Sequence, residues 1–319
     1  MNSGTADLQL CPRQATRARI FEKVVIMKSE TISVFFPFAI MFMLMPTMTS
    51  CASAPGERAD YGLEESVCGL KEPFVFWLWS RAAGAADHSR VLHERNIEDI
   101  ALKTRDGRLI RGYRLKAVAD TEAPFKAKGY LLVTQGNAML AGQIISSFRN
   151  FCRIGYDVYI FDYRGYGRSE GKRRLKAILN DYREIIAHLN DLSYPRHLYY
   201  GMSFGGIVLL DALKGNDDEK SVVIDSTPSR LSDYGCPANY DPVNNLPEDS
   251  SDFLFIAGDR DPVVKPESSR ELLELAQERG ASVLRDPQFS HPFMDRKPED
   301  HKRRRNAVES FLVDGNPGE

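Results

Sequence analysis

The sequence lacks a strong excess of charge of either sign. It contains 42 lysine and arginine residues against 44 aspartate and glutamate residues, which gives a formal net charge of −2. This balance argues against a protein that coats nucleic acid, because such proteins carry a large positive excess. Two local basic runs remain, GKRRLK from Gly171 and HKRRR from His301. We expect each run to form the solvated face of a helix.

Charge is absent altogether from residues 31–55, where ISVFFPFAIMFMLMP is almost wholly apolar. The run is short for a membrane span and contains two prolines, so it is more typical of the apolar region of an export signal. MTSCAS follows it and resembles the lipobox of bacterial lipoproteins, which implies that Cys51 is acylated and anchors the chain in a membrane. An uncleaved signal anchor and a soluble protein with an apolar amino-terminal helix are the alternatives.

Residues 1–50 are therefore predicted to be an amino-terminal extension followed by a lipoprotein-type signal. Met27-Lys28 would be a more ordinary start, so residues 1–26 are expected to be an upstream extension. Ala52 and Ser53 do not resemble an inner-membrane retention signal. By analogy with known lipoproteins, this favours the outer membrane facing the periplasm, with an inner-membrane signal anchor as the alternative.

Cysteine is scarce, with five residues in the chain. On the lipoprotein hypothesis Cys11 is removed and Cys51 is lipidated, so an odd number remains, namely Cys68, Cys152 and Cys236. Cys152 lies in an apolar helical pattern and is expected to be buried. A disulfide between Cys68 and Cys236 is conceivable in an oxidising compartment, and the sequence leaves that pairing open.

Two segments separate the lipobox from the first strand pattern. Residues 51–72 are predicted to be a tether, because ASAPGERAD is small and polar. Residues 73–95 hold both tryptophans of the chain, Trp77 and Trp79, among phenylalanines. This composition is typical of a helix that rests on a bilayer beside a lipid anchor, and also of a helix that packs on the folded domain.

From residue 96 to residue 319 apolar strand patterns alternate with helical patterns, which predicts an α/β domain. A β-hairpin around Asp106-Gly107 leads into a mostly parallel sheet of about eight strands with helices on both faces. LAGQIISSFRNFCRIG predicts a helix in this series. Residues 227–251, rich in Pro, Asn, Asp and Ser, are expected to be a short cap or loop between two strands.

HLYYGMSFGG begins as a strand and ends as a helix, with Ser203 at the junction. Ligands of open α/β sheets bind at the carboxyl ends of the strands, so a serine at this point is a candidate nucleophile. Gly201 and Gly205 remove side chains that would clash in a sharp turn. The unpaired N–H groups at the start of the helix can bind an oxyanion.

A serine nucleophile needs a base to take its proton and an acid to orient that base. FIAGDRDPVV ends a strand with Asp259 and Asp261, and DPQFSHPFMD after the next strand contains His291. The five other histidines precede the sheet, lie inside a helix, start a strand or flank a basic helix. His291 is therefore the predicted base, and Asp225 at the end of SVVID is the reserve candidate for the acid.

With these residues in this order, the region from residue 96 onward resembles an α/β-hydrolase domain. YGMSFGG is similar to the family's nucleophile elbow, with Ser203 as nucleophile. AGDRDPVV resembles its Gly-x-x-Asp-x-x-Val acid motif, which selects Asp261, and FSHPF resembles its histidine loop. DYRGYGRSEG is similar to a glycine-rich turn of many members. Its glycines miss the Gly-x-Gly-x-x-Gly spacing, which argues against a dinucleotide site.

The chain departs from the family where the oxyanion hole is built. Members usually have His-Gly after that strand, and this chain has Gln135-Gly136-Asn137. The resemblance implies that the backbone N–H groups of Asn137 and Phe204 are the oxyanion donors. A glutamine keeps the backbone donor but changes what supports the loop.

The resemblance implies a serine hydrolase that cleaves a small-molecule carboxylic ester through an acyl-enzyme, without a metal or organic cofactor. A haloalkane dehalogenase or an epoxide hydrolase would carry aspartate at the elbow. The short insertion at residues 227–251 implies a small lid and an open site. A thioesterase, amidase or peptidase with the same triad is one alternative. A non-catalytic hydrolase-like binding protein is the other.

Overall fold

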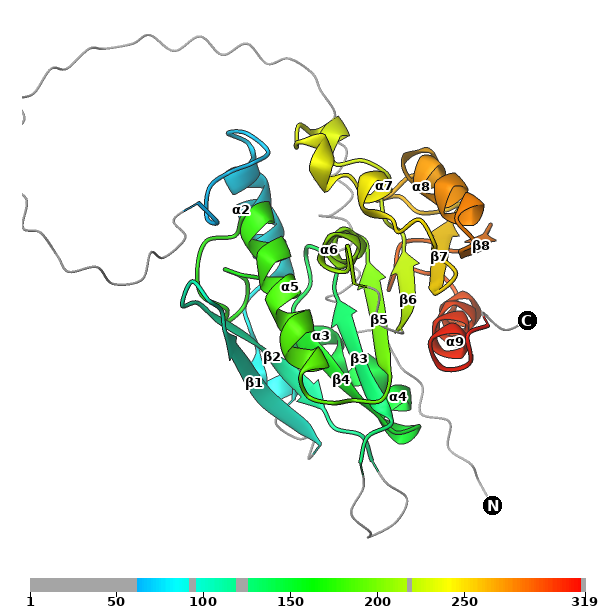
Figure 1. Cartoon of the computed structure of the whole chain (residues 1–319), viewed down its shortest axis with the longest axis horizontal. Coiled ribbons are helices and arrows are strands. Elements are labelled where there is room, and N and C mark those ends of the chain that lie inside the picture. The colour runs from blue at the N-terminus through cyan, green and yellow to red at the C-terminus, as the bar shows by residue number, and fades with distance from the viewer. Residues whose placement is uncertain (1–61, 92–95, 119–125, 217–219, 317–319) are drawn as a thin grey trace, which may run out of the picture. The chain divides into compact units, whose positions relative to one another are not determined.

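The computed structural model describes residues 62–91, 96–118, 126–216 and 220–316 (Figure 1). Its strands are β1 (Ile97–Lys103), β2 (Leu109–Leu115), β3 (Gly129–Thr134), β4 (Tyr156–Phe161), β5 (His197–Met202), β6 (Lys220–Asp225), β7 (Phe253–Gly258) and β8 (Ser282–Asp286). Its α-helices are α2 (Glu72–Ala83), α3 (Ala141–Ile144), α4 (Arg149–Arg153), α5 (Leu175–Asn190), α6 (Phe204–Ala212), α7 (Pro242–Asn245), α8 (Pro266–Glu278) and α9 (Pro298–Asp314).

The strands form one sheet of eight within the described residues, in the order β1-β2-β4-β3-β5-β6-β7-β8. β1 and β2 are the antiparallel hairpin, β2 also pairs antiparallel with β4, and the other neighbours are parallel. Every residue of β3, β4 and β7 is buried, because helices cover both faces of the sheet. The predicted α/β-hydrolase architecture is confirmed.

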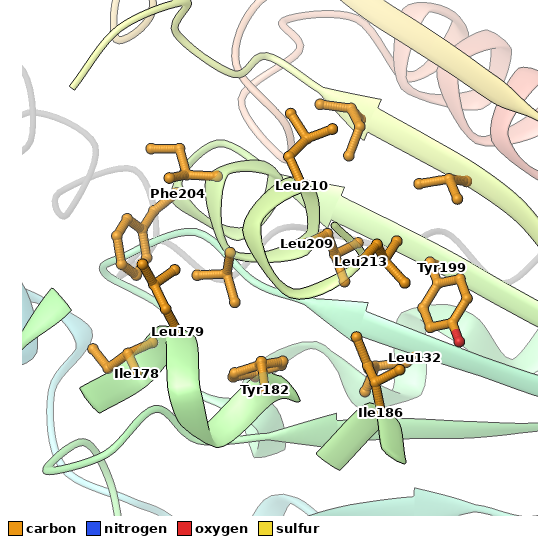
Figure 2. Close-up of a cluster of buried hydrophobic side chains, with 14 of the residues drawn as sticks. Leu132, Ile178, Leu179, Tyr182, Ile186, Tyr199, Phe204, Leu209, Leu210 and Leu213 are labelled. Carbon is orange, nitrogen blue, oxygen red and sulfur yellow. The ribbon is translucent and has the colours of Figure 1, made fainter. Parts of the chain in front are cut away.

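Two hydrophobic clusters fill the two sides of the sheet. Side chains of α2, α5, α6, α7 and α8 contribute to one cluster, and those of α3, α4 and α9 contribute to the other. Figure 2 shows the first cluster, where apolar side chains of α5 and α6 lie together with Leu132 of β3 and Tyr199 of β5. In α6 the residues from Phe204 to Asp211 are all buried. Close packing on all sides fixes the position of this helix and of the residue that precedes it.

The helix predicted over residues 140–155 is broken into α3, a 3₁₀ turn (Ile145–Phe148) and α4. The backbone leaves the helical region at Ile144 and Phe148, with φ of −121° and −101°. β-branched and serine residues fill this stretch and weaken a regular helix. The breaks allow Ile144, Phe148 and Phe151 to be buried in the same cluster on the sheet.

The compact unit that contains the sheet begins at Gly62, well before residue 96 where the sequence predicted the domain to start. The buried carboxylate of Glu72 accepts hydrogen bonds from the backbone N–H groups of Val67 and Cys68, and from that of Leu175 at the start of α5. The aromatic segment therefore packs on the domain, the second of its two expected arrangements. Residues 62–72, assigned to a tether, also belong to this unit.

A disulfide joins Cys68, just before α2, to Cys236 in the insertion between β6 and β7. The free Cys152 is buried, as expected. The signal segment, Cys51 and the start of the tether lie outside the described residues. Among the helices that the structure does describe, none has both the length and the apolar character needed to cross a bilayer.

The glycine-rich turn after β4 is a structural clamp. The buried guanidinium of Arg164 bonds Asp181 of α5 and Asp106 of the β1–β2 turn, so it holds the hairpin against the helix. Asp162 is buried and accepts a hydrogen bond from the Ala141 N–H at 2.7 Å. A β-carbon at Gly167, where φ is 52°, would lie 2.2 Å from Asp162 Oδ2, so only glycine fits there.

We expect Asp162 to make stability depend on pH. Burial raises its pKa to about 6, although the N–H groups of Ala141 and Arg168 and the charge of Arg168 act against burial. The folded protein therefore binds this proton more tightly than the unfolded chain does. The free energy of unfolding falls as the pH rises from the usual pKa of an aspartate to about 6. Asp162→Asn should remove this pH dependence, on the order of 3 kcal/mol between about pH 4 and about pH 7.5, because an amide does not titrate in this range. Urea unfolding at the two pH values measures the dependence in each protein, and equal dependence in the two proteins would contradict the prediction.

Candidate active site

Ser203 occupies the turn between β5 and α6. Its φ is 55° and its ψ is −118°, a conformation that a residue with a side chain rarely adopts. A β-carbon at Gly201 would lie 2.8 Å from the Gly206 Cα, and one at Gly205 would lie 2.0 Å from the Thr134 oxygen. Both glycines are therefore required by close backbone approach, as the sequence predicts for a nucleophile elbow.

Hydrogen bonds to β6 and to the segment that follows it hold the elbow in this strained form. The Ser203 N–H donates to the backbone oxygen of Asp225 at 2.8 Å. The Thr227 hydroxyl donates to the backbone oxygen of Ser203 at 3.0 Å. These hydrogen bonds hold the Ser203 backbone in a conformation that would be unfavourable without them, as is common for strained residues at functional sites.

Asp261 and His291 are hydrogen-bonded to each other. His291 Nδ1 lies 2.8 Å from Asp261 Oδ2, and both side chains are buried. Asp261 Oδ1 accepts hydrogen bonds from the N–H groups of Val263 and Val264. Burial raises the pKa of Asp261, but the charge of His291 and these hydrogen bonds outweigh burial and hold the pKa below its usual value. An ionised Asp261 orients the imidazole so that Nε2 is free to accept a proton.

The other candidate acids have different partners. Asp259 pairs with Arg285, and both side chains are partly exposed. Asp225, the reserve candidate, accepts from Arg304 at 2.5 Å and from the Tyr200 hydroxyl at 2.9 Å. Among the described residues, no hydrogen bond joins either carboxylate to His291.

The buried side chain of Arg304, on α9, braces the loop that carries His291. Its Nη2 donates to the backbone oxygen of Ser290 at 2.6 Å, and its Nε donates to Asp295 Oδ2 at 3.0 Å. Asp295 Oδ1 in turn accepts from the Ser290 N–H at 2.8 Å. The loop is therefore fixed on both sides of the histidine.

Arg304 also connects the histidine loop to the serine. Its Nη1 binds the side chain of Asp225, whose backbone oxygen accepts the Ser203 N–H. The described residues include no hydrogen bond between Ser203 Oγ and His291, and such catalytic contacts are often long in unliganded enzymes. Sequence reasoning missed this role, because HKRRR predicts a solvated helix face and Arg304 is only 3% exposed.

The Gln135-Gly136-Asn137 loop lies directly beside the nucleophile. A β-carbon at Gly136 would be 3.9 Å from the Ser203 Cβ. The buried Gln135 side chain donates through Nε2 to the Phe161 oxygen at 2.8 Å, and the Tyr163 hydroxyl donates to the Gln135 backbone oxygen. The Gln135 side chain therefore supports this loop, at the position where the resemblance would predict His-Gly.

Two backbone donors are available at this loop and at the elbow. Within the described part of the chain, no hydrogen bond occupies the N–H of Asn137 or that of Phe204. Phe204 is the first residue of α6, where N–H groups have no intrahelical partner and the helix dipole favours negative charge. An oxyanion beside Ser203 is the chemistry that such donors stabilise.

Aromatic side chains of α2 pack against the elbow. The rings of Phe76 and Trp79 lie with centroids 5.6 Å and 6.1 Å from that of Phe204, the residue after the nucleophile. Among the described residues, no group of three or more His, Cys, Asp or Glu side chains could hold a metal ion.

Arg304→Met should strongly destabilise the protein, because it leaves Asp225 and Asp295 buried without their cation. We expect the free energy of unfolding to fall by about 3–5 kcal/mol. The matched control is Arg303→Met, since the half-exposed Arg303 also makes two ion pairs. That change should cost far less, because solvent-exposed ion pairs contribute little to stability. Urea unfolding compares the two, and similar losses would show that the buried brace has no special role.

Comparisons with known proteins agree with this geometry. A family model described as serine aminopeptidase, S33, matches residues 126–234, which include the elbow. The uncharacterized protein YfhR of Escherichia coli K12 is 28% identical over 221 residues, covering 62% of this chain and 75% of YfhR. The uncharacterized membrane protein YNL320W of Saccharomyces cerevisiae is 27% identical over 234 residues, covering 66% of this chain and 80% of that one.

Solved structures show the same fold. The Pyrococcus furiosus esterase Pf2001 matches with a TM-score of 0.53 at 19% identity, covering 70% of this chain and 93% of the esterase. The Xanthomonas campestris protein XC6422, described as an α/β serine hydrolase without a lid, matches with a TM-score of 0.52 at 19% identity, covering 72% and 99%. Together with the sheet order, these structures show that the chain has the α/β-hydrolase fold, and the family model indicates that residues 126–234 are similar to a hydrolase of the serine type.

Proposed function

We propose that the protein is a serine hydrolase that cleaves carboxylic esters at the cell envelope, with Ser203, His291 and Asp261 as its triad. The observation that carries the proposal is the 2.8 Å contact between His291 Nδ1 and Asp261 Oδ2, at the same sheet edge as a serine on a strained elbow. If His291 had only a structural role, the fold would not need a serine with positive φ at this edge of the sheet, between two glycines that no larger residue can replace.

In the proposed reaction Ser203 Oγ attacks the ester carbonyl carbon while His291 Nε2 takes the hydroxyl proton. Asp261 stabilises the imidazolium that forms. The carbonyl oxygen becomes an oxyanion and is bound by the N–H groups of Asn137 and Phe204. His291 then protonates the leaving alcohol as the acyl-enzyme forms. A water molecule, deprotonated by His291, releases the acid and regenerates the serine, so no metal or organic cofactor takes part.

The solved structures that match favour an ester over an amide. The structures of an esterase and a lidless serine hydrolase match over 93% and 99% of their lengths. A Mycobacterium tuberculosis puromycin-hydrolyzing peptidase matches with a TM-score of 0.52 at 16% identity, covering 68% of this chain but only 39% of its own. The insertion at residues 227–251 is short, and its three helical turns form a small cap, which favours an open site. A thioesterase or amidase with the same triad is the second candidate, supported by the serine aminopeptidase model.

Fluorophosphonate labelling tests the proposed triad. The chain from Ala52 to the carboxyl end should be labelled, Ser203→Ala should not, and His291→Ala and Asp261→Asn should react roughly 10²–10⁴-fold more slowly. Asp259→Asn is the matched control, because that carboxylate pairs with Arg285, and it should react at the parent rate. If the folded parent chain is not labelled, the active triad is refuted and a binding role takes its place.

The cell-envelope location rests on the proposed acylation of Cys51. The Cys68–Cys236 disulfide supports it, because structural disulfides persist in oxidising compartments and are rare in the cytosol. The outer membrane facing the periplasm is the proposed position of the anchor.

Metabolic labelling with a radioactive fatty acid tests the anchor in bacteria that express the full chain. The parent should be labelled and recovered with the outer membrane, and Cys51→Ala should lose the label. Cys11→Ala, in the segment that processing removes, should behave as the parent. A parent chain that stays in the inner membrane without label would instead establish the signal-anchor alternative.

A further inference from the structure

Exposed apolar side chains concentrate in one short stretch of the chain. Among the described residues, six large hydrophobic or aromatic side chains are exposed: Leu70, Phe74, Trp77, Val118, Leu192 and Tyr234. The first three fall within eight consecutive residues at α2 and just before it, with exposures of 99%, 61% and 47%. Contiguous exposed apolar residues usually mark an interaction site, whereas single ones need no explanation.

Phe74 and Trp77 are three residues apart, the spacing of neighbours on one face of α2, and Leu70 lies in the turn two residues before this helix begins. The rings of Phe74 and Trp77 stack with centroids 5.8 Å apart. The other side of α2 buries Phe76 and Ala83 in the domain core, so the helix is apolar on two sides, and only this buried side packs on the described part of the chain.

Tyr234 of the cap is also exposed, but its side chain is hydrogen-bonded to Ser268 of α8 and is not counted with the side chains of α2. We call Leu70, Phe74 and Trp77 the docking face.

Basic side chains border the docking face. Lys71 and Arg81 are exposed on α2 or next to it, and Lys172 is exposed in the GKRRLK run. This run lies beside the helix, because Arg173 Nη1 donates to Ser80 Oγ at 2.8 Å and Lys176 Nζ donates to the Gly62 oxygen at 3.2 Å. Leucine and aromatic residues edged by lysine and arginine are the composition of helices that lie in the interface of an anionic bilayer.

We propose that the docking face seats the domain on the surface of a bilayer that contains anionic lipid. Its position in the chain supports a membrane over a protein partner. Ten residues separate Cys51 from Gly62, so an extended chain between the two reaches at most about 40 Å. This argument from position rests on the proposed acylation of Cys51, whereas the composition of the docking face and its basic border do not.

Docking would orient the candidate active site. The buried side of α2 contacts Phe204 through Phe76 and Trp79, and the opposite side carries the docking face. An α-helix with its side chains is about 10–12 Å across. The nucleophile elbow therefore lies about one helix diameter from the lipid surface.

Vesicle binding by the chain from Ala52 onward, which lacks Cys51 and cannot be acylated, tests the proposal. Residues 62–316 carry both core clusters, the sheet and the disulfide, so this chain keeps every described contact. It should co-sediment with vesicles of phosphatidylcholine and phosphatidylglycerol. It should bind vesicles of phosphatidylcholine alone more weakly. Added salt should reduce the difference, because salt screens the basic border.

The triple variant Leu70→Ser, Phe74→Ser and Trp77→Ser should bind the mixed vesicles at least about tenfold more weakly, because it loses three large apolar side chains. The matched control is Val118→Ser with Leu192→Ser, which removes exposed apolar residues elsewhere and should bind as the parent does.

Three results would overturn the proposal. They are a parent chain that binds neither vesicle, a triple variant that binds like the parent, and a dimer in sedimentation equilibrium that the triple variant abolishes. The last result would assign the docking face to contact between two copies of the chain. Fluorophosphonate labelling of the same preparations keeps the two proposals distinguishable, since a chain that binds vesicles without labelling refutes the triad alone.

Discussion

A single buried guanidinium connects the parts of the candidate active site that come from distant parts of the chain. Arg304 of α9 binds the side chain of Asp225 at the end of β6 and the loop around Ser290. The backbone of Asp225 holds the Ser203 N–H, and Ser290 precedes His291. A buried charge with several well-made hydrogen bonds is costly to displace. The relative placement of nucleophile and base therefore depends on this contact.

Elsewhere in the site, buried polar side chains also form hydrogen bonds to groups on rigid elements. Gln135 bonds the Phe161 oxygen at the end of β4, and Asp261 accepts two backbone N–H groups besides His291. Polar groups held in this way need little reorganisation when charge develops in a reaction. Among the described residues the exceptions at the site are the buried Gln135 Oε1 and the N–H groups of Asn137 and Phe204, and these two donors lie where an anion would be bound.

Features of the site that depend on neighbouring residues could be predicted from the sequence, whereas features that depend on contacts between distant residues could not. Glycines flanking Ser203 predict the elbow because the steric demand of a sharp turn is set by neighbouring residues. Nothing near Arg304 distinguishes it from the other basic residues of HKRRR, because its burial depends on carboxylates from β6 and the histidine loop. The domain start at Gly62 was missed for the same reason, since Glu72 is held by the start of α5, a hundred residues away.

The disulfide that joins the cap to the segment before α2 also closes a covalent loop that contains only one of the three proposed catalytic residues. Cys68 and Cys236 are 168 residues apart, and the loop that they close contains β1 to β6 and Ser203, whereas Asp261 and His291 lie outside it. Closing a loop of this length removes roughly 5 kcal/mol of unfolded-chain entropy in the chain-entropy model. A protease that cuts the chain once inside the loop releases no fragment, because both pieces remain joined through sulfur. The molecule can thus survive a nick with its nucleophile still attached to its base.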